Sequence, residues 1–462
     1  MIKRTALFSL LFSLPAFAAQ ITYLEKPRVA LSALYQAIST ANKQIDISYY
    51  EAQPCHTVTK VLIRAIHERR QVRPNLRVRF LFDAHPIEDR AVIALPEHLR
   101  RNGIEARVFN NTYKWNPRYN HRTHAKYLVA DDKLITGGRN LTDNYYGLRQ
   151  GEVNWIDADL LIEDASTAAQ ARKHFQLIWD NNHTYKPESA STDLMNQAQQ
   201  CLAWGPREQA LLDYLKTGHA GYLQSTLTTQ CPQAQFVADD MEFSSLAFDW
   251  DAQTQIGGGF EKLNRERVDK KPTIRALTRL LAPAQRMTLA NHIYIPFGRT
   301  AEIIEQKRNA GVPITLYTNY YRGSGYLYED IHNYYTKADT RGSQKNYAIG
   351  TVARPDLDWE FTPAGTKYSN HAKIYIVNGR DVGVTSLNFD PRSYMHNVES
   401  GAFVANCPVL ATHIEKSYVS EMTSGLSAQE QSAVQTRLKG NYGTPLTKPS
   451  DQTMAWLMSQ FL

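Results

Sequence analysis

The chain has 462 residues, of which 43% are hydrophobic and 21% charged, so it is long enough for two or three globular domains. This composition excludes intrinsic disorder and low complexity as descriptions of the whole chain. The net charge of +7 is a mild basic bias. It suits an anionic substrate, such as a phospholipid head group or a nucleic acid, without selecting between them.

Residues 1–18 have the pattern of a secretory signal peptide. Lys3 and Arg4 precede an apolar run that ends before Pro15, and an A-F-A sequence follows as a cleavage signal. The run is shorter than the about 20 residues that span a bilayer, so an uncleaved anchor is the weaker interpretation. We therefore expect an exported, periplasmic or secreted protein, whose net charge after cleavage is 7 − 2 = +5.

The first half alternates short β-rich runs with an amphipathic helical stretch. Strands are predicted at residues 44–50, 76–82 and 104–109, and a helix at residues 56–69. Alternation of this kind indicates a mainly parallel sheet covered by helices.

The second half repeats this order, with strands at 287–295, 313–317 and 347–352 and a helix at 301–309. After its third strand each half reaches a similar block, H-A-K-Y-L-V-A-D from His124 and H-A-K-I-Y-I-V-N from His371. The separation between the start of the first strand and the motif histidine is similar in the two halves, 124 − 44 = 80 and 371 − 287 = 84. An internal duplication predicts two similar α/β/α halves about a pseudo-two-fold axis.

These patterns divide the chain after the signal peptide into four parts. They are a first half at 19–186, a connecting segment with the start of the second half at 187–285, a second half at 286–424 and a tail at 425–462. The apolar end of the tail, residues 454–462, could touch a membrane surface, but packing on the core is the preferred interpretation.

The four cysteines suit two disulfides in an oxidising compartment. Cys201 and Cys231 are closest in sequence and are the favoured pair, which leaves Cys55 with Cys407. Free, buried cysteines are the alternative. The spacing does not fit a zinc site, which needs close cysteine pairs.

The repeated block places one imidazole and one ammonium on the same side of a strand in each half. His124 and Lys126 are separated by a single alanine, as are His371 and Lys373, and alternate positions of a strand share a face. A solvated surface strand is the simple interpretation of either block alone. Recurrence at matched spacing argues for a site instead.

An asparagine follows each block, Asn140 in G-G-R-N and Asn388 in T-S-L-N. Its spacing from the motif histidine is nearly the same in the two halves, 140 − 124 = 16 and 388 − 371 = 17. Two ammonium groups and two amides suit a tetrahedral phosphate, and two imidazoles suit in-line displacement at phosphorus. The lysines neutralise phosphoryl charge, so we expect neither a metal nor a cofactor. A carboxylate should orient each imidazole, and Glu152 and Glu399 are the candidates by spacing.

The two blocks and their surroundings resemble the phospholipase D superfamily, whose signature H-x-K-x4-D occurs twice. R-T-H-A-K-Y-L-V-A-D with G-G-R-N-L-T-D-N-Y-Y, and S-N-H-A-K-I-Y-I-V-N with S-L-N-F-D-P-R-S-Y, are similar to the motifs of bacterial cardiolipin synthase-type members. The resemblance covers most of residues 40–424. It implies the phospholipase D fold and a covalent phosphohistidine, which water resolves by hydrolysis and an alcohol by transfer.

Mapped onto this chain, the resemblance assigns roles residue by residue. The first-motif histidine is often the nucleophile, which implies that His124 attacks and His371 is the acid and base. Lys126, Lys373, Asn140 and Asn388 bind phosphate. The supporting residues are Asp131, Glu152, Ser386, Glu399 and Asn378.

The second motif departs from the pattern because Asn378 replaces its aspartate. That aspartate usually has a structural role beside the site, and asparagine keeps the shape and the hydrogen bonds, so we expect a modest cost. Asp157 and Asp159, after the first motif, either structure the site rim, bind a head group or form a simple turn.

The leading hypothesis is an exported phospholipase D-like phosphodiesterase that removes glycerophospholipid head groups at a membrane surface, with transphosphatidylation possible. A cardiolipin synthase-type phosphatidyltransferase is the alternative. A nuclease is disfavoured because a net charge of +5 is low for a protein that binds duplex nucleic acid. A degenerate binding protein is disfavoured because both His-Lys pairs are intact. We expect a peripheral membrane contact, no nucleic acid partner and a monomer, although the sequence does not determine the oligomeric state.

Overall fold

The computed structural model describes residues 18–84, 90–110, 121–186, 192–224, 226–240, 268–294, 296, 298–319, 345–349 and 357–419. The predicted signal peptide, apart from Ala18, lies outside the described residues, as does the predicted tail at 425–462. The described chain starts its first strand at Ala19, directly after the predicted cleavage site.

The elements of the first half and of the segment that follows it alternate as expected. The strands are β1 (Ala19–Leu24), β2 (Gln44–Tyr49), β3 (Arg77–Asp83), β4 (Glu105–Phe109), β5 (Tyr127–Ala130), β6 (Lys133–Gly137), β7 (Val153–Ile156), β8 (Asp159–Glu163), β9 (Thr184–Tyr185), β10 (Thr228–Cys231) and β11 (Gln233–Ala238). The helices are α1 (Pro27–Thr40), α2 (Thr57–Val72), α3 (Arg90–Arg101), α4 (Ala165–Trp179), α5 (Thr192–Cys201) and α6 (Pro206–Gln224), with a 3-10 turn at Asp143–Tyr145.

The second half repeats the alternation. Its strands are β12 (Met287–Ala290), β13 (Ile314–Asn319), β14 (Lys345–Ile349), β15 (Lys367–Asn370), β16 (Ile374–Val377), β17 (Asp381–Thr385) and β18 (Ser400–Ala405). Its helices are α10 (Pro272–Leu281), α11 (Gly298–Asn309), α13 (Pro391–Met395) and α14 (Pro408–Ile414), followed by a π-helical turn at Glu415–Val419.

The two large sheets share one strand order, which confirms the predicted duplication. Among the described strands, the first sheet contains the order β8-β6-β5-β2-β3-β4, and the second is ordered β18-β17-β16-β12-β13-β14. An additional strand then pairs with β8 in one sheet and with β18 in the other, β1 and β11 respectively. The α/β fold of two similar halves is therefore as predicted.

The expectation of mainly parallel sheets is wrong. In each half the parallel pairs of the large sheet join three consecutive strands, β2-β3-β4 and β12-β13-β14. The described strands on the other side of β2 and β12 pair antiparallel. The short turn after each motif strand makes the β5-β6 and β16-β17 pairs antiparallel, since a tight turn can join only antiparallel neighbours.

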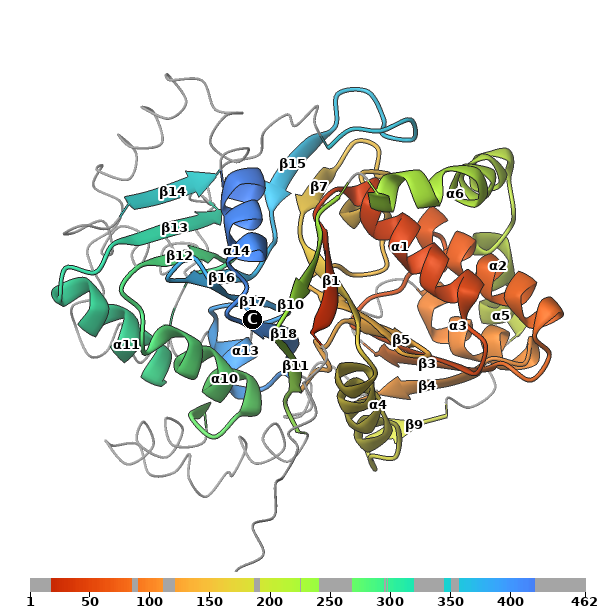
Figure 1. Ribbon diagram of the computed structural model, residues 1–462. Coiled ribbons are helices and arrows are strands. Elements are labelled where there is room, and N and C mark those ends of the chain that lie inside the picture. Colours follow the sequence, from red (N-terminus) through yellow and green to blue (C-terminus); the bar gives the residue numbers. More distant parts are fainter. Residues whose placement is uncertain are drawn as a thin grey trace, which may run out of the picture.

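Helices cover the outer faces and one continuous core joins the halves. Figure 1 shows α1, α2 and α6 over the first sheet, and α10 and α11 beside the second. Between the sheets, Tyr127 and Val129 of β5 share a buried cluster with Ile374 and Ile376 of β16. The motif strands are thus buried in the middle of the molecule, where long apolar runs are expected. Among the described helices, none is long and apolar enough to cross a bilayer.

Two disulfides form, but not with the favoured pairing. Cys55 bonds to Cys201 and Cys231 bonds to Cys407, so the expected Cys201–Cys231 pair is wrong, and so is the alternative of free cysteines. Cys201 and Cys231 are kept apart by the 19 residues of α6, which extend over about 28 Å.

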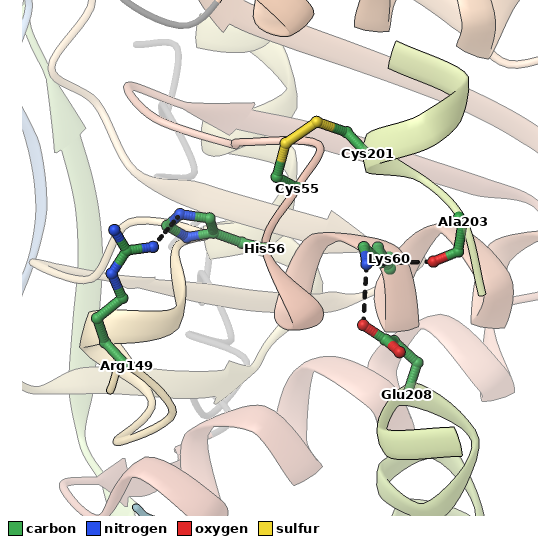
Figure 2. The surroundings of a disulfide bond; sticks show 7 residues. All are labelled: Cys55, His56, Lys60, Arg149, Cys201, Ala203 and Glu208. Atoms are coloured by element: carbon green, nitrogen blue, oxygen red, sulfur yellow. Dashed lines mark hydrogen bonds and ion pairs between the residues drawn. A yellow bond between two sulfur atoms is a disulfide. The ribbon is translucent and has the colours of Figure 1, made fainter. Parts of the chain in front are cut away.

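Figure 2 shows what the first disulfide holds together. Cys55 lies in the loop between β2 and α2, and Cys201 is the last residue of α5. Nearby, Lys60 of α2 donates to the Ala203 carbonyl at 3.2 Å and pairs with Glu208 of α6 at 2.9 Å. The loop that follows β2 is therefore anchored to the connecting segment.

Candidate active site

Each motif histidine and lysine lies directly before a buried strand in the middle of its sheet. His124 and Lys126 precede β5, and His371 and Lys373 precede β16. The imidazoles are 8% exposed and the lysines 1%. In both halves the ammonium donates to the carbonyl of the motif histidine, at 2.8 Å for Lys126. The two blocks share this contact, and each presents an imidazole with an ammonium. Lys373 Nζ also lies 2.7 Å from His371 Nδ1.

Backbone hydrogen bonds cross between the halves at both motifs. The His124 N–H donates to the Val398 carbonyl at 2.9 Å, and the Val398 N–H donates to the Arg122 carbonyl at 2.7 Å. In the opposite exchange, β15 pairs with β7, and the His371 N–H donates to the Ile156 carbonyl at 2.8 Å. Each motif is thus paired with the segment that precedes an acidic residue of the other half.

That exchange gives each imidazole a carboxylate from the opposite half. His124 Nδ1 lies 2.9 Å from Glu399, and His371 Nδ1 lies 2.6 Å from Asp157. Both carboxylates are fully buried. A carboxylate on Nδ1 sets the tautomer that leaves Nε2 for chemistry and stabilises an imidazolium.

Glu399 is a carboxylate that the sequence selected, but Glu152 is a correction. Glu152 lies at the surface, paired with Arg149 at 2.6 Å, and it contacts neither motif imidazole. The position that orients His371 is Asp157. Its spacing from Asn140, 157 − 140 = 17, exceeds the spacing of Glu399 from Asn388, 399 − 388 = 11, so the assumption of equal spacing selected the wrong acid.

The two carboxylates differ in their surroundings. Ser393 donates to Glu399 at 2.7 Å, and Ser386 also donates to it. Burial raises the pKa of Glu399, but the charge of His124 and its hydrogen bond outweigh burial and hold that pKa at about 2. For Asp157 burial prevails and raises the pKa, although Lys373 opposes it.

The bases of the site are all shifted toward their neutral forms. Burial lowers the pKa of His124 to about 4, although Glu399 raises it, and burial lowers the pKa of His371 well below its ordinary value. Burial lowers the pKa of Lys126 to about 7 and that of Lys373 to about 8. An anion bound among these groups replaces their lost hydration and favours their charged forms.

The two asparagines lie in equivalent loops after β6 and β17. Asn140 Nδ2 donates to the Tyr145 hydroxyl at 3.2 Å, and that hydroxyl lies 3.1 Å from His371 Nε2. The Asn388 N–H donates to the Ser393 hydroxyl at 3.3 Å. Both amide groups are buried, at 3% and 8% exposed. Asn140 therefore reaches the reactive nitrogen of the second-motif imidazole through a single hydroxyl.

Buried side chains hold these loops in place. Arg139, in the loop before Asn140, pairs with Asp159 at 3.1 Å and donates to the Leu24 carbonyl at 2.7 Å. In the second half, Asp390 caps α13 by accepting from the Ser393 N–H at 2.7 Å. Asp159 thus has a structural role, one of the alternatives that its sequence context left open.

The last residue of each motif lies at the far end of its strand, away from the imidazole. Asp131 and Asn378 both adopt positive φ, 48° and 54°. The Asp131 carboxylate accepts from the N–H groups that begin β2, including Gln44 at 3.1 Å, and Asn378 Oδ1 accepts from Gln285 and Arg286 at 2.7 and 3.2 Å. Asparagine tolerates this left-handed backbone and still accepts, so the replacement keeps the turn.

Aromatic rings that the motifs do not include line both imidazoles. Tyr50 contacts His124 at a centroid distance of 5.0 Å, and His292 and Trp155 contact His371 at 4.8 and 5.5 Å. Tyr50 follows β2 and His292 follows β12, at equivalent positions relative to the motif strand that each pairs with. That equivalence is a signal the sequence contained, once the two first strands are aligned on their motifs.

The site brings together groups that suit phosphoryl transfer. Each half contributes an imidazole with an orienting carboxylate partner, an ammonium and an amide, which is the set that the sequence predicted for a phosphodiester. In the part of the chain that the structure describes, no cluster of three or more His, Cys, Asp or Glu side chains could hold a metal ion.

Comparisons with known proteins identify relatives of this chain. Residues 34–179 match the family model "Cardiolipin synthase, PLD-like domain". Cardiolipin synthase C of Escherichia coli K12 is 23% identical over 86% of this chain and 83% of its own length. Cardiolipin synthase 1 of Staphylococcus aureus strain COL is 31% identical over 33% of this chain and 30% of its own length.

The fold is also that of a solved structure. The crystal structure of phosphatidylserine synthase from Haemophilus influenzae Rd KW20 superposes with a TM-score of 0.60 at 14% identity, over 97% of this chain and 98% of that one. The chain therefore has the phospholipase D fold. The family model and the cardiolipin synthase relative, rather than this structural match, indicate an enzyme of the phosphodiesterase and phosphatidyltransferase type. More specifically, residues 34–179 are a phospholipase D-like domain of the cardiolipin synthase family model.

Proposed function

We propose that this protein exchanges the alcohol of glycerophospholipids, transferring a phosphatidyl group through a phosphohistidine to an acceptor alcohol, with water as a competing acceptor. The observation that carries the proposal is that each half provides a buried carboxylate, which orients the imidazole of the other half. This arrangement provides a nucleophile and a proton carrier of nearly the same construction.

In the first step we assign His124 as the nucleophile. Its Nε2 forms a bond to phosphorus while the bond from phosphorus to the head-group oxygen breaks. His371, in the imidazolium form that the bound phosphate and Asp157 favour, gives its Nε2 proton to that oxygen, so the head group leaves with a protonated hydroxyl. Glu399 stabilises the positive charge that develops on the His124 ring.

The second step reverses these roles with a new alcohol. The acceptor hydroxyl attacks phosphorus, its proton passes to His371, and the bond between phosphorus and His124 breaks. A water molecule in the same position gives phosphatidic acid instead. Lys126, Lys373, Asn140 and Asn388 are proposed to bind the nonbridging phosphoryl oxygens through both steps, where positioned donors contribute most to the barrier.

Transfer and hydrolysis use the same chemical steps, so the site chemistry does not choose between them. We favour transfer because of the proteins to which this chain is similar. The Escherichia coli relative, matched over most of both chains, is a cardiolipin synthase. We therefore place an alcohol such as phosphatidylglycerol as the preferred acceptor. Hydrolysis of head groups, the leading hypothesis from the sequence, becomes the second candidate.

We further propose that the enzyme is exported and acts at a membrane surface outside the cytoplasm. The signal-like residues 1–18 support export, and so do two disulfides, which persist in oxidising compartments. The substrate is a lipid, so the protein must touch the membrane at least peripherally.

The test is product analysis by mass spectrometry. The mature protein is incubated with phosphatidylglycerol and phosphatidylethanolamine vesicles in the presence of a chelator, with His124→Ala and His371→Ala as controls. Cardiolipin as the main product supports transfer, and phosphatidic acid with free head group supports hydrolysis. No lipid product, or full activity in both alanine variants, contradicts the proposed function.

A further inference from the structure

The mechanism leaves one carboxyl beside the site without a role, that of Glu51. Glu51 lies just beyond the end of β2 and is half-buried. Its backbone carbonyl accepts from the Leu141 N–H at 2.9 Å, and its neighbour Ala52 forms a β-bridge with Leu141. The backbone of Glu51 is therefore fixed against the loop that carries Asn140.

A chain of short contacts leads from this carboxyl to the proposed proton carrier. Asn140 Nδ2 lies 3.2 Å from Glu51 Oε2 and 3.2 Å from the Tyr145 hydroxyl. The same hydroxyl lies 3.1 Å from His371 Nε2. Glu51 is thus connected to the reactive nitrogen of His371 through two intervening side chains, those of Asn140 and Tyr145.

The duplication supplies an internal comparison. Ser48 pairs with Tyr127 and Ala290 with Ile374, and each partner is the first residue of its motif strand. Ser48 and Ala290 are therefore equivalent positions of the two halves. Glu51 and Ile293 each lie three residues further along the chain, so they are equivalent as well. The bridges agree, because Ala52 pairs with the residue after Asn140 as Tyr294 pairs with the residue after Asn388.

At this position the two halves therefore have side chains of different polarity. One half has a carboxyl, and the other has an isoleucine that is 8% exposed. A phosphodiester has two unlike substituents, and in a phospholipid one is a polar head-group alcohol while the other bears two acyl chains. An unlike pair at equivalent positions matches a substrate with unlike ends.

No ion pair accounts for the position of Glu51, because in the described part of the chain no cation lies within ion-pair distance of it. Burial raises the pKa of Glu51, with Lys126 and the Asn140 hydrogen bond acting in the opposite direction. A carboxyl kept in this position at a cost in solvation is expected to have a ligand.

We propose that Glu51 is a specificity-determining residue that accepts a hydrogen bond from the hydroxyl or ammonium of the head-group alcohol. This inference rests on the proposed function and deepens it, because it names the class of alcohol exchanged: one that carries a donor group besides the reacting hydroxyl. The leaving and the entering alcohol occupy the same position in the two steps, so Glu51 selects both.

The Cys55–Cys201 disulfide restrains the loop that carries Glu51. Glu51 and Cys55 lie in one loop between β2 and α2, and the disulfide ties that loop to α5 (Figure 2). A carboxyl that discriminates between alcohols needs a fixed position relative to the phosphate, which an anchored loop provides.

The test compares Glu51→Ile, Glu51→Gln and wild type on three vesicle lipids. Phosphatidylglycerol offers a hydroxyl donor, phosphatidylethanolamine an ammonium, and phosphatidylmethanol neither. We expect Glu51→Ile to lower kcat/KM about tenfold to a hundredfold on the first two lipids, as for the loss of a hydrogen bond to a charged group, and less than about threefold on phosphatidylmethanol. Glu51→Gln keeps an acceptor, so its loss should fall mainly on the ethanolamine lipid.

Glu152→Gln is the matched control, because Glu152 is an exposed carboxylate of the same half and should leave all three rates unchanged. Thermal melting checks that each variant folds. Equal losses on the three lipids would overturn the inference and make Glu51 a positioning residue for Asn140, and no loss on any lipid would overturn it as well. A wild-type protein inactive on every phospholipid would instead refute the proposed function, and this inference with it.

Discussion

Replacing Glu399 by glutamine tests how the halves depend on each other, because it changes the charge beside His124 with almost no change in shape. Glu399 is fully buried, and it is the ionised partner of an imidazole from the other half at 2.9 Å. Ser386 and Ser393 donate to different oxygens of Glu399; in the glutamine variant one hydroxyl still donates to Oε1 and the other can accept from Nε2, so we expect the fold to persist.

The magnitude follows from the bond that loses its charge. A hydrogen bond to a charged group contributes about 1.5–3 kcal/mol, so Glu399→Gln should lower kcat by about 10- to 150-fold. The loss should fall on kcat more than on KM, because positive charge on His124 develops in the transition state. The variant also removes an anion that raises the pKa of Lys126, so the activity profile should move to lower pH.

The assay is steady-state phosphatidyl transfer on phosphatidylglycerol vesicles across a range of pH, with circular dichroism to verify folding. Glu163→Gln is the matched control, because Glu163 forms a half-exposed ion pair with Lys133 away from the site. A folded Glu399→Gln enzyme with wild-type kcat and an unchanged pH profile would refute the role assigned to this carboxylate.

Three further predictions concern separate parts of the molecule. Asn378→Asp should leave kcat within about twofold and change the free energy of unfolding by less than about 1 kcal/mol, because an acceptor in the same turn is retained; urea titration and the lipid assay check this, and a large loss of activity would contradict it. The kcat/KM should fall as pH rises through about 7 to 8, because the Lys126 ammonium, whose pKa burial lowers to about 7, loses its charge in the free enzyme; Lys126→Arg should move this limb to higher pH, and an unmoved limb in an active variant would count against it. Reduction of Cys231–Cys407, whose sequence separation is 176, should lower stability by about 5 kcal/mol in the chain-entropy estimate; equal melting temperatures with and without reductant would exclude this.

The sequence predicted what depends on local pattern. The two H-A-K blocks, their matched asparagines and the alternation of strands and helices are periodic features, and they repeat. The same local turn explains Asn378, whose side chain needs only to accept backbone hydrogen bonds at a positive φ.

The sequence did not predict what depends on how the halves meet. Asp157 orients His371 because β7 pairs with β15. The positions of these two strands in the sequence do not predict that they pair. The chain between Asn140 and Asp157 is longer than its counterpart in the second half, so spacing favoured Glu152. The predicted disulfide pairing was wrong for a related reason. Cys201 lies before α6 and Cys231 lies beyond its other end, so closeness in sequence is not closeness in space.

The central claim is that a phosphatidyl group is carried covalently on one imidazole of a pair. The direct measurement is intact-protein and peptide mass spectrometry after rapid quenching of the enzyme with phosphatidylglycerol under conditions that preserve phosphohistidine. We predict a phosphatidyl adduct on His124 in the wild-type enzyme during turnover, and we predict that this adduct is absent from His124→Ala. Lipid turnover without an adduct, together with retained turnover in His124→Ala, would contradict the account.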